Sequence, residues 1–264
     1  MKLDSPNNGS LVFVISSGLF LIVLSGCGNP LNRFTKQYKC HLEGKADPRT
    51  AYEFVERSFE HVRLDQTDCA LSACNEAIRL DSRYASGYAC RGAMLGHKGE
   101  YLNGLEDLNY AIRLQPANGD YYHTRAQINA RLGNMDQAIS DATKATELIS
   151  SEFGRSVAFA FRGSLYRKQS KLSEAIKDYD EAVQLAPNFA YHIGTRGDIR
   201  VELKDYDRAI ADYTEAIRLD PRNQYFLRDR AGAYKAIGKY DLASQDEAAA
   251  NLLNDGAVAA TPSP

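Results

Sequence analysis

An alanine recurs in this 264-residue chain at intervals of 34, 34, 37, 34 and 34 residues, and this period restricts the chain to a repeat architecture. Self-similarity at a fixed period near 34 residues is typical of stacked helical hairpins, in which each copy contacts mainly its neighbours. The six recurring alanines are Ala77, Ala111, Ala145, Ala182, Ala216 and Ala250. We divide residues 51–253 into six copies, each numbered from 1, which start at Ala51, Ala85, Gly119, Ser156, Ala190 and Gln224.

Each copy predicts two closely packed helices, helix A and helix B. Positions 8 and 20 hold a small residue in every copy, and position 4 holds a large apolar residue. Positions 4, 8 and 11 share one helix face, and so do positions 20, 24 and 27. Small residues at a crossing let two helices approach, while large side chains fill the flanking space.

The residues between the helices fit this interpretation. Position 15, where a helix end often needs a left-handed residue, is glycine in three copies, and serine or lysine in two others: Gly99, Gly133, Gly238, Ser170 and Lys204. Prolines at position 32 close three copies where helix B must end: Pro116, Pro187 and Pro221. Three extra residues around Gly154 predict a longer loop and a local break between copies three and four.

The repeat resembles the tetratricopeptide repeat family. The residues that carry the resemblance are Arg162, Gly163, Leu172, Ala175, Tyr179, Ala182 and Pro187, and again Arg196, Gly197, Tyr206, Ala209, Tyr213, Ala216 and Pro221. It covers about three quarters of the chain and implies an all-α fold, an α-solenoid of six hairpins in a right-handed superhelix. Glu247 replaces the expected tyrosine at position 24 of copy six, so we expect the array to end there and residues 254–264 to be a disordered tail.

The start of the chain predicts export and lipid anchoring. A 14-residue apolar run, Leu11 to Leu24, has the length of a signal-peptide core. The following Leu24-Ser25-Gly26-Cys27 resembles the lipobox of bacterial lipoproteins, which implies a signal peptide over residues 1–26 and lipidation of Cys27. Gly28, where aspartate favours inner-membrane retention, implies the outer membrane, facing the periplasm. An uncleaved anchor is the alternative, and residues 27–50 read as a tether.

Composition argues against several functions. The net charge is −2, without a basic bias, so we expect no nucleic-acid partner. The five histidines are scattered, four of them among the copies and His41 before them, and the chain lacks CxxC and HExxH spacings. We therefore expect no metal, cofactor, small-molecule substrate or catalysis. Cys69 and Cys74 should not pair with each other. We expect Cys74 to be a buried thiol and Cys40 to be the best candidate for a disulfide.

Two charges recur within the repeat. Position 7 is arginine in all six copies, and position 23 is aspartate in five. The arginines could form an anion-binding ladder. We favour ion pairs between packed helices, which would set the stacking register.

In the tetratricopeptide repeat family, positions 2, 5, 9, 12 and 13 of helix A line a concave groove. The resemblance places ten candidate partner-binding residues there: Tyr52, Phe59, His97, His123, Arg131, Arg167, Lys168, Tyr191, Tyr225 and Arg228. These predict a groove that is apolar at its front and basic in its middle, suited to a peptide with apolar anchors and an acidic segment. The tether could instead cover Tyr52 and Phe59, and the basic residues could be ordinary solvated charges.

The family's chaperone-binding branch clamps a carboxylate with lysine at position 5 and asparagine at position 9. No copy here has that pair. Copy six comes nearest, with Arg228 at position 5, but it has Gly232 at position 9. We therefore expect a non-catalytic scaffold or adaptor that binds a protein or peptide partner at the bacterial envelope. The alternatives are a pilotin-like factor for secretin or type IV pilus assembly, and an adaptor for cell-wall hydrolases or a periplasmic protease.

Overall fold

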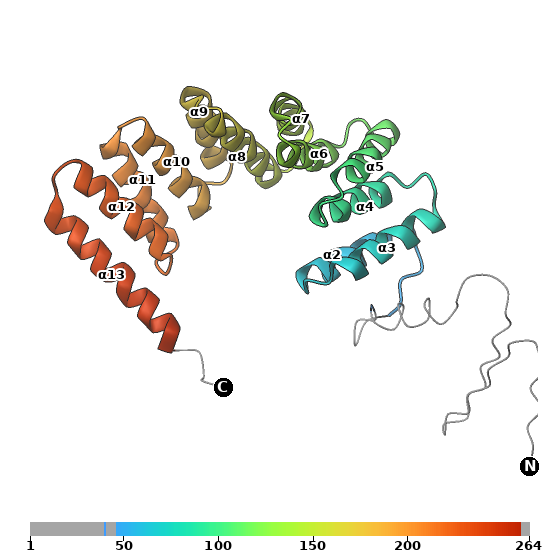
Figure 1. The fold of residues 1–264 in the computed structure, drawn as a ribbon, viewed down its shortest axis with the longest axis horizontal. Coiled ribbons are helices and arrows are strands. Elements are labelled where there is room, and N and C mark those ends of the chain that lie inside the picture. Colours follow the sequence, from blue (N-terminus) through green and yellow to red (C-terminus); the bar gives the residue numbers. More distant parts are fainter. Residues whose placement is uncertain (1–39, 41–45, 260–264) are drawn as a thin grey trace, which may run out of the picture.

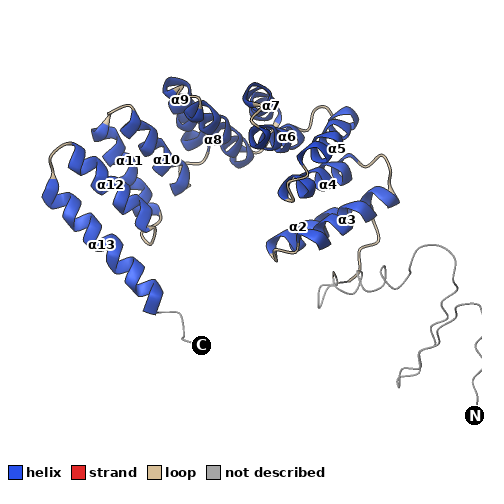
Figure 2. Ribbon diagram, viewed as in Figure 1, coloured by secondary structure: helices blue, strands red, loops and turns tan. Residues whose placement is uncertain are grey.

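The structure, a computed structural model, describes residue 40 and residues 46–259. The expected signal peptide, Cys27 and most of the tether lie outside these residues. The described part contains twelve α-helices and no strand (Figure 2). They are α2 (Ala51–Arg63), α3 (Thr67–Leu80), α4 (Ala85–His97), α5 (Tyr101–Leu114), α6 (Gly119–Leu132), α7 (Met135–Leu148), α8 (Glu152–Lys168), α9 (Leu172–Leu185), α10 (Ala190–Glu202), α11 (Tyr206–Leu219), α12 (Gln224–Ala236) and α13 (Tyr240–Ala259).

The helices form six consecutive hairpins arranged around an arch, which confirms the predicted α-solenoid (Figure 1). Helix A is the even-numbered helix of each hairpin. In Figure 1, α4, α6 and α8 lie toward the inside of the arch, and their partners α5, α7 and α9 lie outside. Helix A therefore supplies the inner face of the arch, where the sequence placed the partner.

Small residues bring the helices together as predicted. All six recurring alanines at position 27 have no exposed surface. A Cβ atom on Gly92 would lie 2.8 Å from the carbonyl oxygen of Gly104, so α4 and α5 touch through their backbones. The large side chains pack beside these contacts in small clusters, such as Ile193 and Phe226 around Ala216. The core is therefore a row of local clusters, one per interface.

Position 15 is left-handed in every copy. The three glycines there have positive φ, as expected, and so do three non-glycine residues: Asp65 at 56°, Ser170 at 59° and Lys204 at 62°. A left-handed conformation costs a residue with a side chain about 1–2 kcal/mol. These three copies therefore carry local strain that glycine would relieve.

Replacing Lys204 with glycine should raise the free energy of unfolding by about 0.5–1 kcal/mol, because relief of the left-handed strain outweighs the entropy that glycine adds to the unfolded chain. Urea denaturation measures the change. Lys204→Ala is the matched control, since it removes the same side chain but keeps the strain. Equal stabilities for the two variants would contradict the prediction.

The expected longer loop between copies three and four is wrong. The three extra residues lengthen helix A, so that α8 begins at Glu152 rather than near Ser156. The side chain of Ser151 caps this helix by accepting a hydrogen bond from the backbone N–H of Gly154 at 3.2 Å. An N-cap serine followed by an acidic residue in the first turn favours helix over loop.

The end of the array also differs from the prediction. Helix α13 continues to Ala259, so residues 254–259 are helical rather than part of a disordered tail. The residues just before it, Ala248 to Leu253, are mostly alanine and leucine, which are strong helix formers. Residues 260–264 lie outside the described part. Glu247, the predicted end marker, is half-exposed and forms an ion pair with Lys235 of α12.

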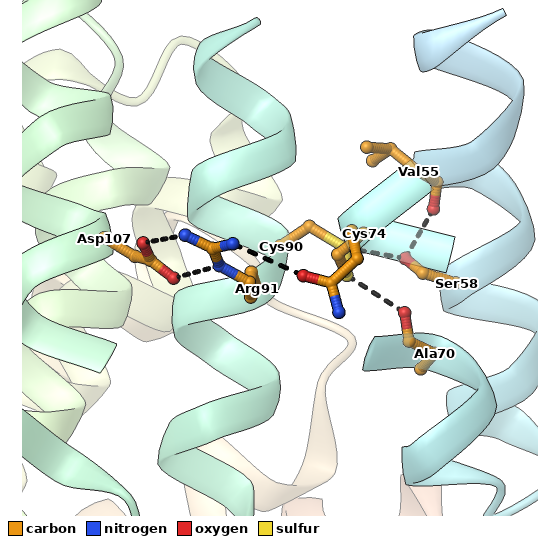
Figure 3. The surroundings of a disulfide bond; sticks show 8 residues. Val55, Ser58, Ala70, Cys74, Cys90, Arg91 and Asp107 are labelled. Atoms are coloured by element: carbon orange, nitrogen blue, oxygen red, sulfur yellow. Dashed lines mark hydrogen bonds and ion pairs between the residues drawn. A yellow bond between two sulfur atoms is a disulfide. The ribbon is translucent and has the colours of Figure 1, made fainter. Parts of the chain in front are cut away.

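Two disulfides fasten the front of the array. Cys40 pairs with Cys69 of α3, with Cα atoms 5.2 Å apart, which confirms the expectation for Cys40. Cys74 of α3 pairs with Cys90 of α4, with Cα atoms 5.7 Å apart, so the expectation of a free buried thiol at Cys74 is wrong (Figure 3). Cys74, at position 24 of copy one, faces helix A of copy two. This packing brings its sulfur within bonding distance of Cys90.

Candidate partner-binding face

The recurring arginines and aspartates form ion pairs between helix A and helix B in five copies. In each pair the guanidinium donates from both Nε and Nη2 to the two carboxylate oxygens, as between Arg162 and Asp178 at 2.9 and 2.7 Å. The aspartates are almost completely buried. Such bidentate pairs use two nitrogens of each guanidinium. They confirm the predicted ion pairs between packed helices rather than an anion-binding ladder. The pairs are Arg91–Asp107, Arg125–Asp141, Arg162–Asp178, Arg196–Asp212 and Arg230–Asp246.

Each of these arginines also reaches the preceding copy. The third nitrogen, Nη1, donates to a side chain at position 25 of the previous helix B, as from Arg91 to Asn75 at 3.3 Å. The other four acceptors are Asn109, Thr143, Asp180 and Thr214. One guanidinium thus joins three helices, which is the arrangement required if these ion pairs set the stacking register. Position 23 of copy one is Ala73, and Arg57 instead donates to the carbonyl oxygen of Ala46.

Four predicted aromatic residues are exposed at position 2 or 9 of helix A. Tyr52, Phe59, Tyr191 and Tyr225 expose 61, 55, 63 and 65% of their surface. Nothing in the described part of the chain covers Tyr52 and Phe59, and most of the tether that could cover them lies outside that part. Exposed aromatic rings on an inner face are typical anchors for a partner.

The predicted residues of copies two and three lie in different environments. His97 and Arg131 line a shallow depression of about 160 Å³ between α4 and α6. His123 instead packs edge-on against Phe161 of α8, with ring centroids 5.2 Å apart. Burial lowers the pKa of His123, which favours a neutral packing residue. Lys168 and Arg228 are exposed at the helix surface.

One of the predicted basic residues of the middle, Arg167, is paired with acidic residues of the next copy. Arg167 of α8 donates to Glu202 at 2.6 Å and lies 3.5 Å from Asp198, so its charge is neutralised. Asp198 also accepts a hydrogen bond from Tyr213 at 2.8 Å. Although the Asp229 side chain is exposed at the surface, partial loss of hydration and the neighbouring Asp198 carboxylate raise its pKa to about 6, against the opposing effect of the Arg167 charge. The inner face over α10 and α12 is therefore acidic.

The sequence did not predict Asp229 as a groove residue, because it stands at position 6, which is not among the family's groove positions. In the described residues its carboxylate has no hydrogen bond or ion pair, and the Asp198 carboxylate repels it. The sequence signal that could have found it is helical spacing, since Asp229 stands four residues after the exposed Tyr225 and so shares its face.

Asp229→Asn should stabilise the fold at neutral pH by up to about 1 kcal/mol, a value reduced from the full shift because the side chain is partly exposed to solvent. The folded pKa lies above the ordinary value of 3.8. The unfolded chain therefore ionises first, and the native protein loses stability as pH rises from about 4 to about 6. Thermal unfolding of both proteins between pH 4 and 7 should show a difference that grows over this interval. A constant difference would contradict the raised pKa.

A buried serine–histidine pair has a structural explanation. Ser156 Oγ lies 3.4 Å from His192 Nε2, and both residues are buried between α8 and α10. The Ser156 hydroxyl donates to the carbonyl oxygen of Phe153 at 2.7 Å. The pair connects two helices and is closed to a substrate.

Neither a metal site nor a membrane span is found within residues 40 and 46–259. No group of three or more histidine, cysteine or acidic side chains is placed to hold a metal ion there. In the same residues, no helix has both the length and the apolar character that crossing a membrane requires.

Comparison with known proteins agrees with the repeat boundaries. Residues 119–151 and 156–189 match profiles described as tetratricopeptide repeat, and residues 197–238 match one described as TPR repeat. Human tetratricopeptide repeat protein 36 is 33% identical over 102 residues, which is 38% of this chain and 53% of that protein. The same protein from Xenopus tropicalis is aligned over 59% of its length, so this chain spans a little over half of these relatives.

Solved structures share the fold at low sequence identity. Pseudomonas aeruginosa PilF aligns with a TM-score of 0.67 and 15% identity, over 74% of this chain and 88% of that one. PilW, described as a widely conserved type IV pilus biogenesis factor, aligns with a TM-score of 0.67 and 14% identity, over 76% of this chain and 92% of that one.

The hairpin stacking and the ion pairs define an α-solenoid whose inner face is built from helix A. Three of its segments are similar to tetratricopeptide repeats, and PilF shares the fold.

Proposed function

We propose that this protein is a non-catalytic scaffold that binds a segment of a protein partner on the inner face of its arch. The observation that carries the proposal is the row of exposed aromatic side chains on helix A, with Tyr191 and Tyr225 on adjacent copies. Proteins rarely leave aromatic rings exposed on a rigid concave surface without a binding role. Proteins of this family bind peptide or protein partners, which agrees with this use of the face.

A photo-crosslinking amino acid at position 191, expressed at native level in cells, tests the scaffold role. We expect one or a few protein adducts that mass spectrometry can identify. The matched control places the same amino acid at Leu102, which is exposed on helix B α5. If position 191 gives no adduct, or the same adducts as position 102, the scaffold role on this face is refuted.

The second part of the proposal is lipid anchoring at Cys27, with the array facing the periplasm from the outer membrane. The support is the Leu24-Ser25-Gly26-Cys27 sequence and the two disulfides, since structural disulfides persist in oxidising compartments. Two or more acyl chains give stable attachment. Metabolic labelling with an alkyne fatty acid should mark the native chain and leave Cys27→Ser unlabelled. Labelling of both would contradict an anchor at Cys27.

A narrower candidate is a pilotin-like role in secretin or pilus assembly. What favours it is the shared fold with PilF and PilW together with the lipobox, although the fold alone does not transmit a function. The other candidate is an adaptor for cell-wall hydrolases or a periplasmic protease. The adducts from position 191 separate them, because secretin or pilus subunits support the first and hydrolases or proteases support the second.

A further inference from the structure

One side of α10 and α12 forms a continuous face, exposed at its two tyrosines and contacted at its acidic residues by Arg167 of α8. We call it the α10–α12 face and define it by Tyr191, Asp198 and Glu202 of α10 and Tyr225, Asp229 and Gly232 of α12. The three residues of α10 are seven and four positions apart, and those of α12 are four and three positions apart. With this helical spacing the residues of each helix lie on one side of it. Two neighbouring copies thus contribute one stripe each.

The two stripes lie side by side because the helices are in contact. The ring of Phe226 in α12 packs directly against Gly194 of α10, where a Cβ atom would collide with it. On the face itself, Tyr191 and Tyr225 are among the most exposed large side chains, and a Cβ on Gly232 would meet no described atom within 4 Å. The face is therefore preformed, apolar at its tyrosines and open at Gly232.

Charge on this face is unbalanced. Arg167 is the cation that pairs with Glu202 and lies near Asp198; it acts on Asp229 only through its charge, and no cation in the described part forms an ion pair with the Asp229 carboxylate. Along the flank, Lys235 is engaged by Glu247, and Arg228 is exposed. Asp198 and Asp229 repel each other across the two helices. A positive group placed between them would remove this repulsion and gain a partner that the fold does not supply.

Resting on the scaffold role proposed above, we infer that the α10–α12 face binds a partner segment that carries a lysine or arginine beside an apolar side chain. The cationic group lies between Asp198 and Asp229, and the apolar side chain packs on Tyr191 or Tyr225. Tyrosine suits both neighbours, since its ring face attracts a cation and its area buries an apolar group. This is opposite in charge to the acidic partner that the sequence alone predicted.

The test uses the full chain, purified in detergent, and two fluorescent peptides of equal length that alternate leucine with either lysine or glutamate. Fluorescence anisotropy should show binding of the lysine peptide and at least tenfold weaker binding of the glutamate peptide. Asp229→Lys should weaken binding of the lysine peptide at least tenfold. Gly232→Leu should weaken it too, by filling the open space without disturbing the core. Circular dichroism confirms that each variant is folded.

Asp136→Lys is the matched control, because it makes the same charge change at an exposed position of helix B α7. It should change the affinity less than twofold, which separates local contact from overall charge. Equal binding of the two peptides, failure of the lysine peptide to bind, or equal effects of Asp229→Lys and Asp136→Lys would each overturn the inference. Crosslinking from position 191 to an acidic partner segment would overturn it while leaving the scaffold role intact.

Discussion

Arg162→Ala should lower the free energy of unfolding by about 3 kcal/mol, because removing one partner of a buried ion pair leaves the other charge without compensation. In the described structure, Asp178 has Arg162 as its ion-pair partner and is only 4% exposed. The same substitution also breaks the hydrogen bond at 3.1 Å from Arg162 to Thr143 of the preceding copy. Urea denaturation followed by circular dichroism measures the loss.

Arg196→Ala is an internal comparison with the same chemistry and a smaller expected loss. Its aspartate, Asp212, keeps a second cation, since Arg200 Nη1 lies 2.7 Å from Asp212 Oδ2. We therefore expect Arg196→Ala to cost about half as much as Arg162→Ala. Asp178→Ala combined with Arg162→Ala should recover part of the loss, because the stranded carboxylate is then gone. If Arg162→Ala costs no more than an ordinary surface substitution, the arginine–aspartate ion pairs do not set the stacking of the copies.

The repeat made the fold predictable because its signals are local and occur six times. A small residue at positions 8 and 20 is required by contacts within one hairpin, and all six copies have it. The three extra residues before Ser156 occur once and have no such support. An insertion of three residues between two helices suggests a longer loop. Ser151 and Glu152 are nevertheless adequate signals for the N-terminus of a helix.

The charge of the inner face could not be predicted in the same way. Arg167 is a groove position by resemblance, but its effect depends on Asp198 and Glu202 of the next copy, 31 and 35 residues later. Counting basic residues along one helix therefore overstates the positive charge. The pairing of Cys74 with Cys90 likewise depends on how two neighbouring copies stack. Properties set between copies need the superhelix geometry, which the spacing alone does not supply.

The stacking itself is tested most directly at a recurring alanine. Ala216→Leu should destabilise the fold by about 3 kcal/mol, since overpacking a tight core forces side chains and backbone to move. Ala216 has no exposed surface and lies among Ile193 and Phe226, at the interface between copies five and six. For a domain of this size, we expect the midpoint of thermal unfolding to fall by about 6–12 °C.

Ala236→Leu makes the same change on the exposed surface of α12 and should leave the midpoint nearly unchanged. If Ala216→Leu were as heat-resistant as Ala236→Leu, the close contact of helices at the recurring alanines would be wrong. The same interface holds Phe226 against Gly194 and so keeps α10 beside α12. Ala216→Leu should therefore also weaken binding of the lysine peptide, although it lies outside the α10–α12 face, because the two stripes that form the face would no longer be in register.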